Sequence, residues 1–120
     1  MLAGQVDAAA ACVEEGLAIT SRYGERQMEA ELRRLRGELA WQRGAVAEAE
    51  VWLKGAYALA MRQHRLGFAL RSATSLARFW VAHGRHARAG RLLIPLVERW
   101  TEGRTTRDVS SALALCQSLQ

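Results

Sequence analysis

Glycine recurs at a fixed interval of 40 residues in this 120-residue chain, at Gly4, Gly44 and Gly84. Each glycine is followed, at the same interval, by a small residue, then a larger aliphatic residue, then a third contact position. These three columns are Ala9, Ala49 and Ala89; Val13, Leu53 and Leu93; and Gly16, Ala56 and Leu96. Columns that keep residue type as well as spacing are typical of stacked copies of one structural unit. An ordinary helical bundle with coincidental spacing is the alternative.

The residues between the glycines have the apolar period of amphipathic helices. Met28, Leu32, Leu35 and Leu39, for example, share one helical stripe. The composition agrees, because alanine, leucine, arginine and glutamate dominate and β-branched residues are sparse. The pattern predicts six helices, over residues 5–22, 26–43, 46–63, 65–83, 86–100 and 106–119.

Two local signals refine the last two predicted helices. Pro95, the only proline, lies inside the fifth helix and predicts a kink or break there, because proline removes a backbone donor and crowds the preceding turn. Thr105 and Asp108 have the spacing of a capping box at the start of the sixth helix, with aspartate in place of the usual glutamate.

The predicted fold is therefore all-α, a solenoid of antiparallel helix pairs with a period of about 40 residues. The length suits one domain, residues 1–120. We expect residues 1–23 to supply the second helix of an incomplete repeat, 24–63 and 64–104 to form two repeats, and 105–120 to form a C-terminal capping helix.

Residues 30–60 resemble a tetratricopeptide repeat. Counted from Ala30, the small contact of the first helix falls at Gly37, the turn at Gly44, and the contacts of the second helix at Ala49, Leu53 and Ala56. The next copy, counted from Leu70, offers Ala77, Gly84, Ala89, Leu93 and Leu96. The period of 40 exceeds the usual value of about 34, and Met61 stands where a proline normally closes the unit.

Residues 24–120 as a whole are similar to the C-terminal helical-repeat region of large bacterial regulators. Those proteins join an ATPase module to a nucleotide cyclase or winged-helix output domain. The likeness includes the unusual Trp-Thr-Glu-Gly segment at 100–103. It implies a non-catalytic sensor or interaction module in signal transduction or transcriptional regulation, and it carries over no cyclase or ATPase residue.

A tetratricopeptide array binds partners on the concave face that its first helices line. By that resemblance the predicted partner-binding residues are Glu31, Arg34, Glu38, Trp41 and Gln42 in one copy, and Arg71, Thr74, Arg78, Val81 and Ala82 in the next. The three arginines would grip a peptide carboxylate or acidic side chains, and Trp41 would supply an aromatic anchor. The alternative is that Arg71 and Arg78 merely pair with Glu31 and Glu38 on the neighbouring helix.

No catalytic constellation stands out, so the chain is not expected to be an enzyme. Lys54 lacks the glycine-rich lead of a phosphate-binding loop, and we expect no cofactor. His83 and His86 flank a turn without further ligands nearby, so no metal site is expected. Cys12 and Cys116 are expected to be small buried residues in a reducing compartment. With no signal peptide and no membrane span evident, the predicted location is the cytoplasm.

Three kinds of partner follow from these observations. A protein or peptide is favoured, including the upstream ATPase module of a parent regulator. Self-association is the alternative, because an incomplete first repeat would leave an apolar flank at Val6, Val13 and Leu17. Nucleic acid is less favoured: the net charge is +5 and arginines gather between Arg22 and Arg36, but glutamates are interleaved with them.

Overall fold

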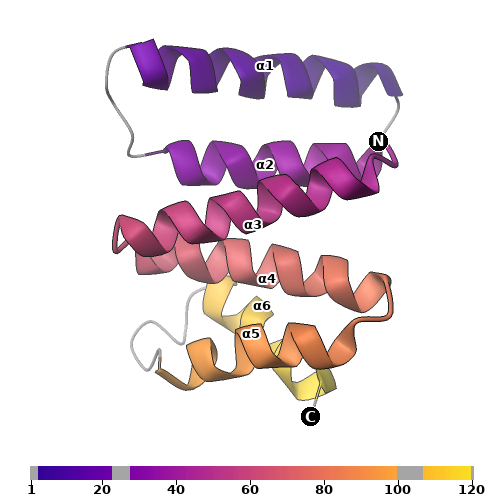
Figure 1. Ribbon diagram of the computed structural model, residues 1–120, viewed down its shortest axis with the longest axis vertical. Helices are drawn as coiled ribbons and strands as arrows, with labels where there is room; N and C mark the ends of the chain where they lie inside the picture. Colours follow the sequence, from indigo (N-terminus) through magenta and orange to yellow (C-terminus); the bar gives the residue numbers. More distant parts are fainter. Residues whose placement is uncertain (1–2, 23–27, 100–106, 120) are drawn as a thin grey trace.

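The computed structural model describes residues 3–22, 28–99 and 107–119, and this part of the chain is entirely helical (Figure 1). The all-α prediction is confirmed, and every predicted helix is present with ends within three residues of those expected. The helices are α1 (Ala3–Arg22), α2 (Glu29–Gln42), α3 (Val46–Arg62), α4 (Leu66–Ala82), α5 (His86–Arg99) and α6 (Arg107–Leu119).

The helices pack in two layers. Each helix contacts the next one along the chain, and in addition α2 contacts α4 and α4 contacts α6. Within the described residues, α1, α3 and α5 make no such contact with one another. Figure 1 shows α3 and α5 in front of the layer that contains α2, α4 and α6. The molecule is elongated, with principal extents of 39 × 30 × 22 Å.

One turn geometry recurs at the three junctions from α2 to α5. At each junction the N–H of one residue donates to the carbonyl five residues earlier in the chain. The N–H of the residue just before it donates to the carbonyl three residues earlier than itself. The longer bonds are Ala45 to Ala40, Arg65 to Ala60 and Arg85 to Trp80, at 2.8–2.9 Å. This pair of bonds is the Schellman motif, which requires one residue in the left-handed conformation. That residue is Gly44, His64 or Gly84, with φ of 83°, 55° and 79°.

His64 is therefore the one side chain at a position where the other two turns have glycine. A Cβ in the left-handed region costs about 1 kcal/mol relative to glycine. We expect His64→Gly to raise the free energy of unfolding by about 0.5–1 kcal/mol, and Gly44→Ala and Gly84→Ala to lower it by a similar amount. Urea denaturation followed by circular dichroism measures all three, and a loss of stability in His64→Gly would contradict the prediction.

Small residues set the spacing between the helices, as predicted. A Cβ added at Gly37 on α2 would lie 2.8 Å from Leu53 Cγ on α3, so only glycine permits this approach. Ala49, Leu53 and Ala56 are fully buried on α3, and Ala89 and Leu93 are fully buried on α5. The repeated columns of the sequence are therefore contact positions in the core.

Of the kink or break expected at Pro95, the break is wrong, because α5 continues through this residue to Arg99. Pro95 is exposed, whereas Leu96 and Val97 beside it are buried, so packing holds the last turn onto the core. The carbonyl that loses its partner is that of Arg91, an exposed residue whose backbone water can reach. The capping residues Thr105 and Asp108 and the segment 100–103 lie outside the described residues and side chains.

Two further expectations about α1 need correction. Cys12 is exposed, while Cys116 is buried as expected. The apolar flank is not left open as predicted, because Val6 and Val13 are buried in a cluster with Leu39 of α2. Leu17 is half-buried against the same cluster. The apolar stripe of α1 is thus mostly used to attach this helix to α2.

Candidate functional site

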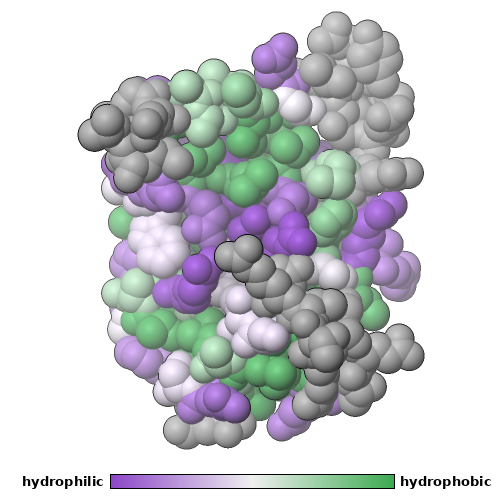
Figure 2. Space-filling model, turned by 180° about the vertical axis from the view of Figure 1, so that it is seen from behind, coloured by the Kyte–Doolittle hydropathy of each residue, from purple (hydrophilic) through white to green (hydrophobic). Residues whose placement is uncertain are grey.

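A network of charged and polar side chains joins α2 to α4, and we call it the α2–α4 charged face. Its members are Glu31, Arg34 and Glu38 on α2 and Arg71, Ser75 and Arg78 on α4. On each helix they recur at intervals of three, four or seven residues, which keeps them on one side. Figure 2 views the molecule from behind and shows hydrophilic residues gathered across the middle of this side, at the height of α2 and α4.

Glu31 is the centre of the network. Its side chain is only 8 % exposed, and it accepts hydrogen bonds from both Arg34 and Arg71. Arg34 donates through Nε to Oε1 at 2.8 Å and through Nη2 to Oε2 at 3.0 Å, a two-pronged contact that fixes the plane of the guanidinium. Arg71 Nη1 donates to Oε2 at 2.6 Å. One buried carboxylate thus holds an arginine from each helix.

The remaining contacts extend the network along both helices. Arg34 Nη1 donates to Ser75 Oγ at 3.1 Å. Arg78 Nη2 donates to Glu38 Oε1 at 3.2 Å. The pairing that the alternative interpretation expected is present, since Arg71 pairs with Glu31 and Arg78 with Glu38. Both pairs join residues 40 apart, so α2 and α4 lie in parallel with equivalent positions side by side.

The electrostatics at Glu31 follow from this arrangement. Burial raises the pKa of the Glu31 carboxyl, but hydrogen bonds from Arg34 and Arg71 together with their charges outweigh burial and leave the pKa below its usual value. Glu31 is therefore ionised at neutral pH, and its charge fixes the two arginines. A carboxyl whose pKa is lowered in this way is poorly matched to general acid–base chemistry near neutral pH.

An aromatic group lies at one end of the charged face. Trp41 meets Phe79 edge to face, with ring centroids 5.3 Å apart. The His83 ring stacks obliquely on Phe79 at 4.4 Å, and its Nδ1 lies 2.7 Å from the Phe79 carbonyl oxygen. Phe79 is buried, Trp41 is half-buried and His83 is exposed. Apolar ring surface thus adjoins the charged face, within reach of a partner.

The predicted partner-binding residues differ in how far their side chains are exposed to solvent. Glu31 and Thr74 are buried, and Thr74 Oγ1 donates to the Leu70 carbonyl at 2.8 Å. Arg71 and Arg78 have side chains 37 % and 54 % exposed. The other positions range from half-buried to exposed: Arg34, Glu38, Trp41 and Val81 are half-buried, and Gln42 and Ala82 are exposed. The most accessible of these side chains are therefore Arg71, Arg78, Gln42 and Ala82.

Three residues of this region were missed by sequence reasoning. Ser75 follows Arg71 by one helical turn, and that spacing was the available signal. Phe79 and His83 are likewise one turn apart at the end of α4, but their contact with Trp41 depends on the α2–α4 register. No local pattern contains that register, because it is set by contacts between residues about 40 positions apart.

A second polar cluster links α3 to α4 and the start of α5. Trp80 Nε1 donates to Glu50 Oε2 at 2.7 Å, as expected for a buried indole, and Arg85 Nη1 donates to the same oxygen at 2.9 Å. The bond from Trp80 lowers the pKa of the Glu50 carboxyl, although burial opposes it. Arg88 lies over the Trp80 ring at 4.5 Å. This cluster joins α3 and the start of α5, in one layer, to α4 in the other layer.

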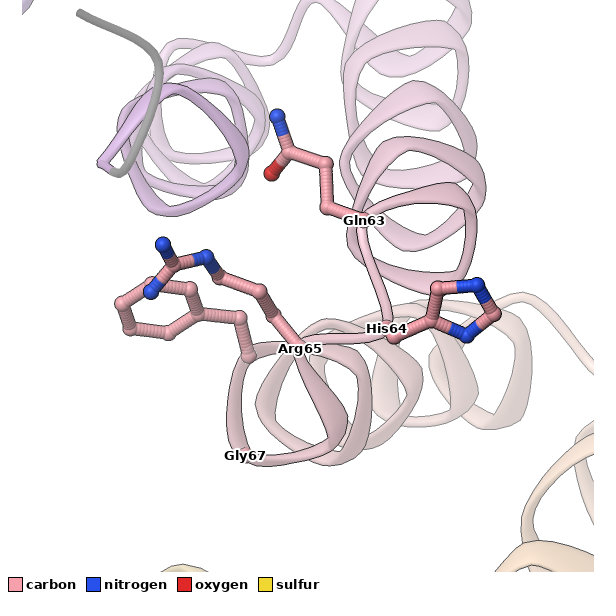
Figure 3. A pocket seen from close by; sticks show the side chains of 5 residues that line it. Gln63, His64, Arg65 and Gly67 are labelled. Atoms are coloured by element: carbon pink, nitrogen blue, oxygen red, sulfur yellow. The ribbon is translucent and has the colours of Figure 1, made fainter.

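The turn between α3 and α4 borders an open hollow of about 400 Å³. Figure 3 shows Gln63 and Arg65 pointing to the same side of this turn, while His64 points away. Gly67 and Phe68 complete the lining as far as the structure describes it, and none of these five residues has a carboxylate or thiol. A second hollow of similar volume lies between α5 and Leu119 of α6.

Within the described residues, no three histidine, cysteine, aspartate or glutamate side chains lie close enough to hold a metal ion. None of the described helices is long and apolar enough to cross a membrane. Comparison of the chain with protein-family models, with curated proteins and with solved structures found no match.

Proposed function

We propose that the chain is a tetratricopeptide-like α-solenoid that acts as a non-catalytic protein-interaction or sensing module. Its partner would bind across α2 and α4, on the side that carries the charged face. The observation that carries this proposal is the ladder of contacts between equivalent positions of α2 and α4, with Arg71 and Arg78 substantially exposed at its edge. Such a surface is ordered before any partner arrives, which lowers the entropic cost of binding.

The solenoid part of the proposal is supported by two regularities. The same turn closes α2, α3 and α4 at intervals of 20 residues, and hydrogen bonds join positions 40 apart. In addition, α2, α4 and α6 contact one another in series, whereas the described parts of α1, α3 and α5 do not. In a two-layered stack, the layer with the closer helices forms the inner side of the curve. The charged face would therefore line the concave side, where solenoids present extended binding surfaces.

The wider setting rests on the resemblance described above. In a bacterial regulator, the module would couple a partner or ligand to an ATPase module of the same polypeptide, in the cytoplasm. The half-buried Trp41 and the exposed arginines suit this role, since aromatic and arginine side chains contribute most at protein interfaces.

Selection from a random peptide library tests the proposal without assuming a partner. Peptides selected on the purified chain should bind more weakly to Arg78→Glu, because this change reverses the charge of the most exposed arginine in the network. Arg91→Glu is the matched control, since Arg91 is an exposed arginine beside the α5–α6 hollow. Binding that survives Arg78→Glu and is lost in Arg91→Glu would contradict the proposed face, as would a selection that yields no binder. Circular dichroism confirms that both variants are folded.

Self-association is the second candidate, and one observation favours it. Leu17, Leu32 and Leu35 are half-buried where α1 meets α2, and they leave apolar surface that a second copy would cover. Figure 2 shows hydrophobic residues above the hydrophilic band. Light scattering over a hundredfold range of concentration distinguishes the candidates, since a constant monomer mass would exclude a dimer through this strip.

Nucleic-acid binding has less support from the contacts. Arg33, Arg34 and Arg36 form the core of the basic cluster in the sequence, but each lies in an ion pair. Their partners are Glu29 at 3.0 Å, Glu31 at 2.8 Å and Glu14 at 2.7 Å. A phosphate backbone would have to compete with these carboxylates for each arginine.

A further inference from the structure

We infer that a partner helix docks beside α1 and α2 and extends the layer of α2, α4 and α6 by one member. This inference goes beyond the α2–α4 charged face and rests on the solenoid part of the proposed function. Figure 1 shows α1 and α2 at one end of the stack. We call the docking surface the α1–α2 end face, and its members are Ala9, Cys12 and Gly16 on α1 and Met28 and Leu35 on α2.

Both helices have one neighbour fewer than the helices that follow them in the same layer. Among the described residues, α3 contacts α2 and α4, and α5 contacts α4 and α6, whereas α1 contacts only α2. In the other layer α4 contacts both α2 and α6, whereas α2 contacts only α4. One helix beside α2 would give both α1 and α2 the additional neighbour, because α2 itself contacts α3 and α4 in this way.

The side chains of α1 show the effect of this difference. Ala9 and Gly16 are seven residues apart, two helical turns, so they lie on one side of α1. Ala9 is half-buried, whereas Ala49, its counterpart 40 positions later on α3, is fully buried. Gly16 is also half-buried, and its counterpart Ala56 is fully buried. The small contact positions are therefore covered on α3 and partly open on α1.

The same comparison holds on α2. Leu35 is half-buried, whereas its counterpart on α4, Ser75, is 1 % exposed and accepts a hydrogen bond from Arg34 of α2 at 3.1 Å. Met28 is 50 % exposed, whereas its counterpart Phe68 is half-buried against a cluster that includes residues of α2. Burial of the apolar side chains of Met28 and Leu35 would supply the driving force for docking.

The contacts that α2 makes with α3 and α4 define the chemistry of the partner helix. Gly37 approaches Leu53 of α3 so closely that an added Cβ would lie 2.8 Å from Leu53 Cγ. The partner helix therefore needs glycine or alanine in the place of Gly37, where it faces α1. Arg34 donates to Ser75, but the residue in the place of Ser75 is here Leu35. The partner helix therefore carries an apolar residue three positions before the small one.

Titration calorimetry with a pair of synthetic helices tests the inference. The probe is a capped peptide of residues 28–43 with the change Arg34→Leu, held helical by a side-chain lactam because a helix of this length is marginal alone. The matched control peptide carries Gly37→Leu in addition, which prevents close approach to α1. We expect the probe to bind about tenfold more tightly than the control. Its affinity should be the same at low salt and at 0.5 M salt, because the contacts are apolar.

The Cys12 thiol reports where the probe binds. Cys12 is exposed, whereas its counterpart Trp52 on α3 is covered by the Arg36 guanidinium of α2, 3.9 Å from the ring centroid. A helix on the α1–α2 end face should therefore slow the reaction of Cys12 with a maleimide, in proportion to the fraction of chain that is bound. Cys116 is buried and should stay unreactive with and without the probe.

A pair of variants of the chain gives a second comparison. Leu35→Glu should weaken binding of the probe about tenfold, because it places a charge against the apolar position of the helix. Val51→Glu is the matched control and should leave binding unchanged, since Val51 is 69 % exposed on α3. Circular dichroism verifies that both variants are folded. If Leu35→Glu is unfolded, the two peptides and the Cys12 thiol still decide the question with the unaltered chain.

Equal binding of the two peptides would overturn the inference, and so would a bound probe that leaves the reactivity of Cys12 unchanged. A chain that dimerises in light scattering and excludes the probe would overturn it as well, since a second copy would then cover the end face. If the probe fails while library-selected peptides depend on Arg78, only this inference fails. If the probe binds while no selected peptide depends on Arg78, the charged face fails as a binding surface and the end face stands.

Discussion

Gly37→Ala should lower the free energy of unfolding by about 1–2 kcal/mol, although alanine is the better helix former by about 1 kcal/mol. The new Cβ would lie 2.8 and 2.9 Å from Leu53 side-chain carbons and 3.2 Å from the Leu53 backbone nitrogen. Leu53 is fully buried and its backbone belongs to α3, so it cannot move aside without separating the two helices. Urea denaturation measured by tryptophan fluorescence gives the change.

Gly55→Ala is the matched control for this prediction, because Gly55 lies in the middle of α3. A Cβ there has only the end of the flexible Arg33 side chain nearby, at 3.8 Å. The better helix propensity of alanine should then dominate and raise stability by about 0.5–1 kcal/mol. If both glycine variants are stabilised, the close approach of α2 and α3 at Gly37 is not present in solution.

Glu31→Gln should cost about 2–3 kcal/mol of stability at pH 7, because it leaves Arg34 and Arg71 without the carboxylate that holds them. The value lies below that of a fully buried ion pair since the Arg71 side chain is more than a third exposed. Glu38→Gln is the control. Its partner Arg78 is 54 % exposed, so the loss there should stay below about 1 kcal/mol.

The pH dependence of the same variant gives an independent readout. The folded-state pKa of Glu31 lies below 4.5, the usual value for glutamate, so the stabilisation from its charge is present above pH 4.5 and is lost as the pH falls through the folded-state pKa. The stability difference between wild type and Glu31→Gln should be constant from pH 7 to about 5.5 and should shrink below pH 4.5. A difference that grows on acidification would contradict the assigned role of the carboxylate.

Helix positions and several interhelical contacts were predictable because both depend on the spacing of apolar and small residues along short stretches of the sequence. Apolar residues at intervals of three and four locate all six helices, and small residues such as Gly37 and Ala49 mark where two helices touch. The turns were predictable where glycine marks them, at Gly44 and Gly84. The turn at His64 has the same geometry without glycine, so composition alone does not reveal it.

Features that depend on tertiary environment were not predictable in the same way. The effect of Pro95 depends on whether the next turn is packed, and Leu96 and Val97 pack it. The exposure of Cys12 depends on which side of α1 faces α2. The charged residues of the site were identifiable, but their burial was not: Glu31 and Arg71 lie 40 residues apart in the same sequence column, yet Glu31 is buried and Arg71 is substantially exposed.

Ion pairing within the charged face is compatible with the binding role that we propose for it. Glu31 and Glu38 fix Arg71 and Arg78 in place, and a fixed guanidinium loses less side-chain entropy when it meets a partner.

Amide chemical-shift mapping of the ¹⁵N-labelled chain, titrated with a library-selected peptide, tests the central claim most directly. The largest shifts are expected on α2 from Glu31 to Gln42 and on α4 from Arg71 to Ala82, and the indole signal of Trp41 should move with them. Shifts confined to α1 or to the outer sides of α3 and α5, with α2 and α4 unchanged, would contradict the assignment of the α2–α4 charged face as the binding surface.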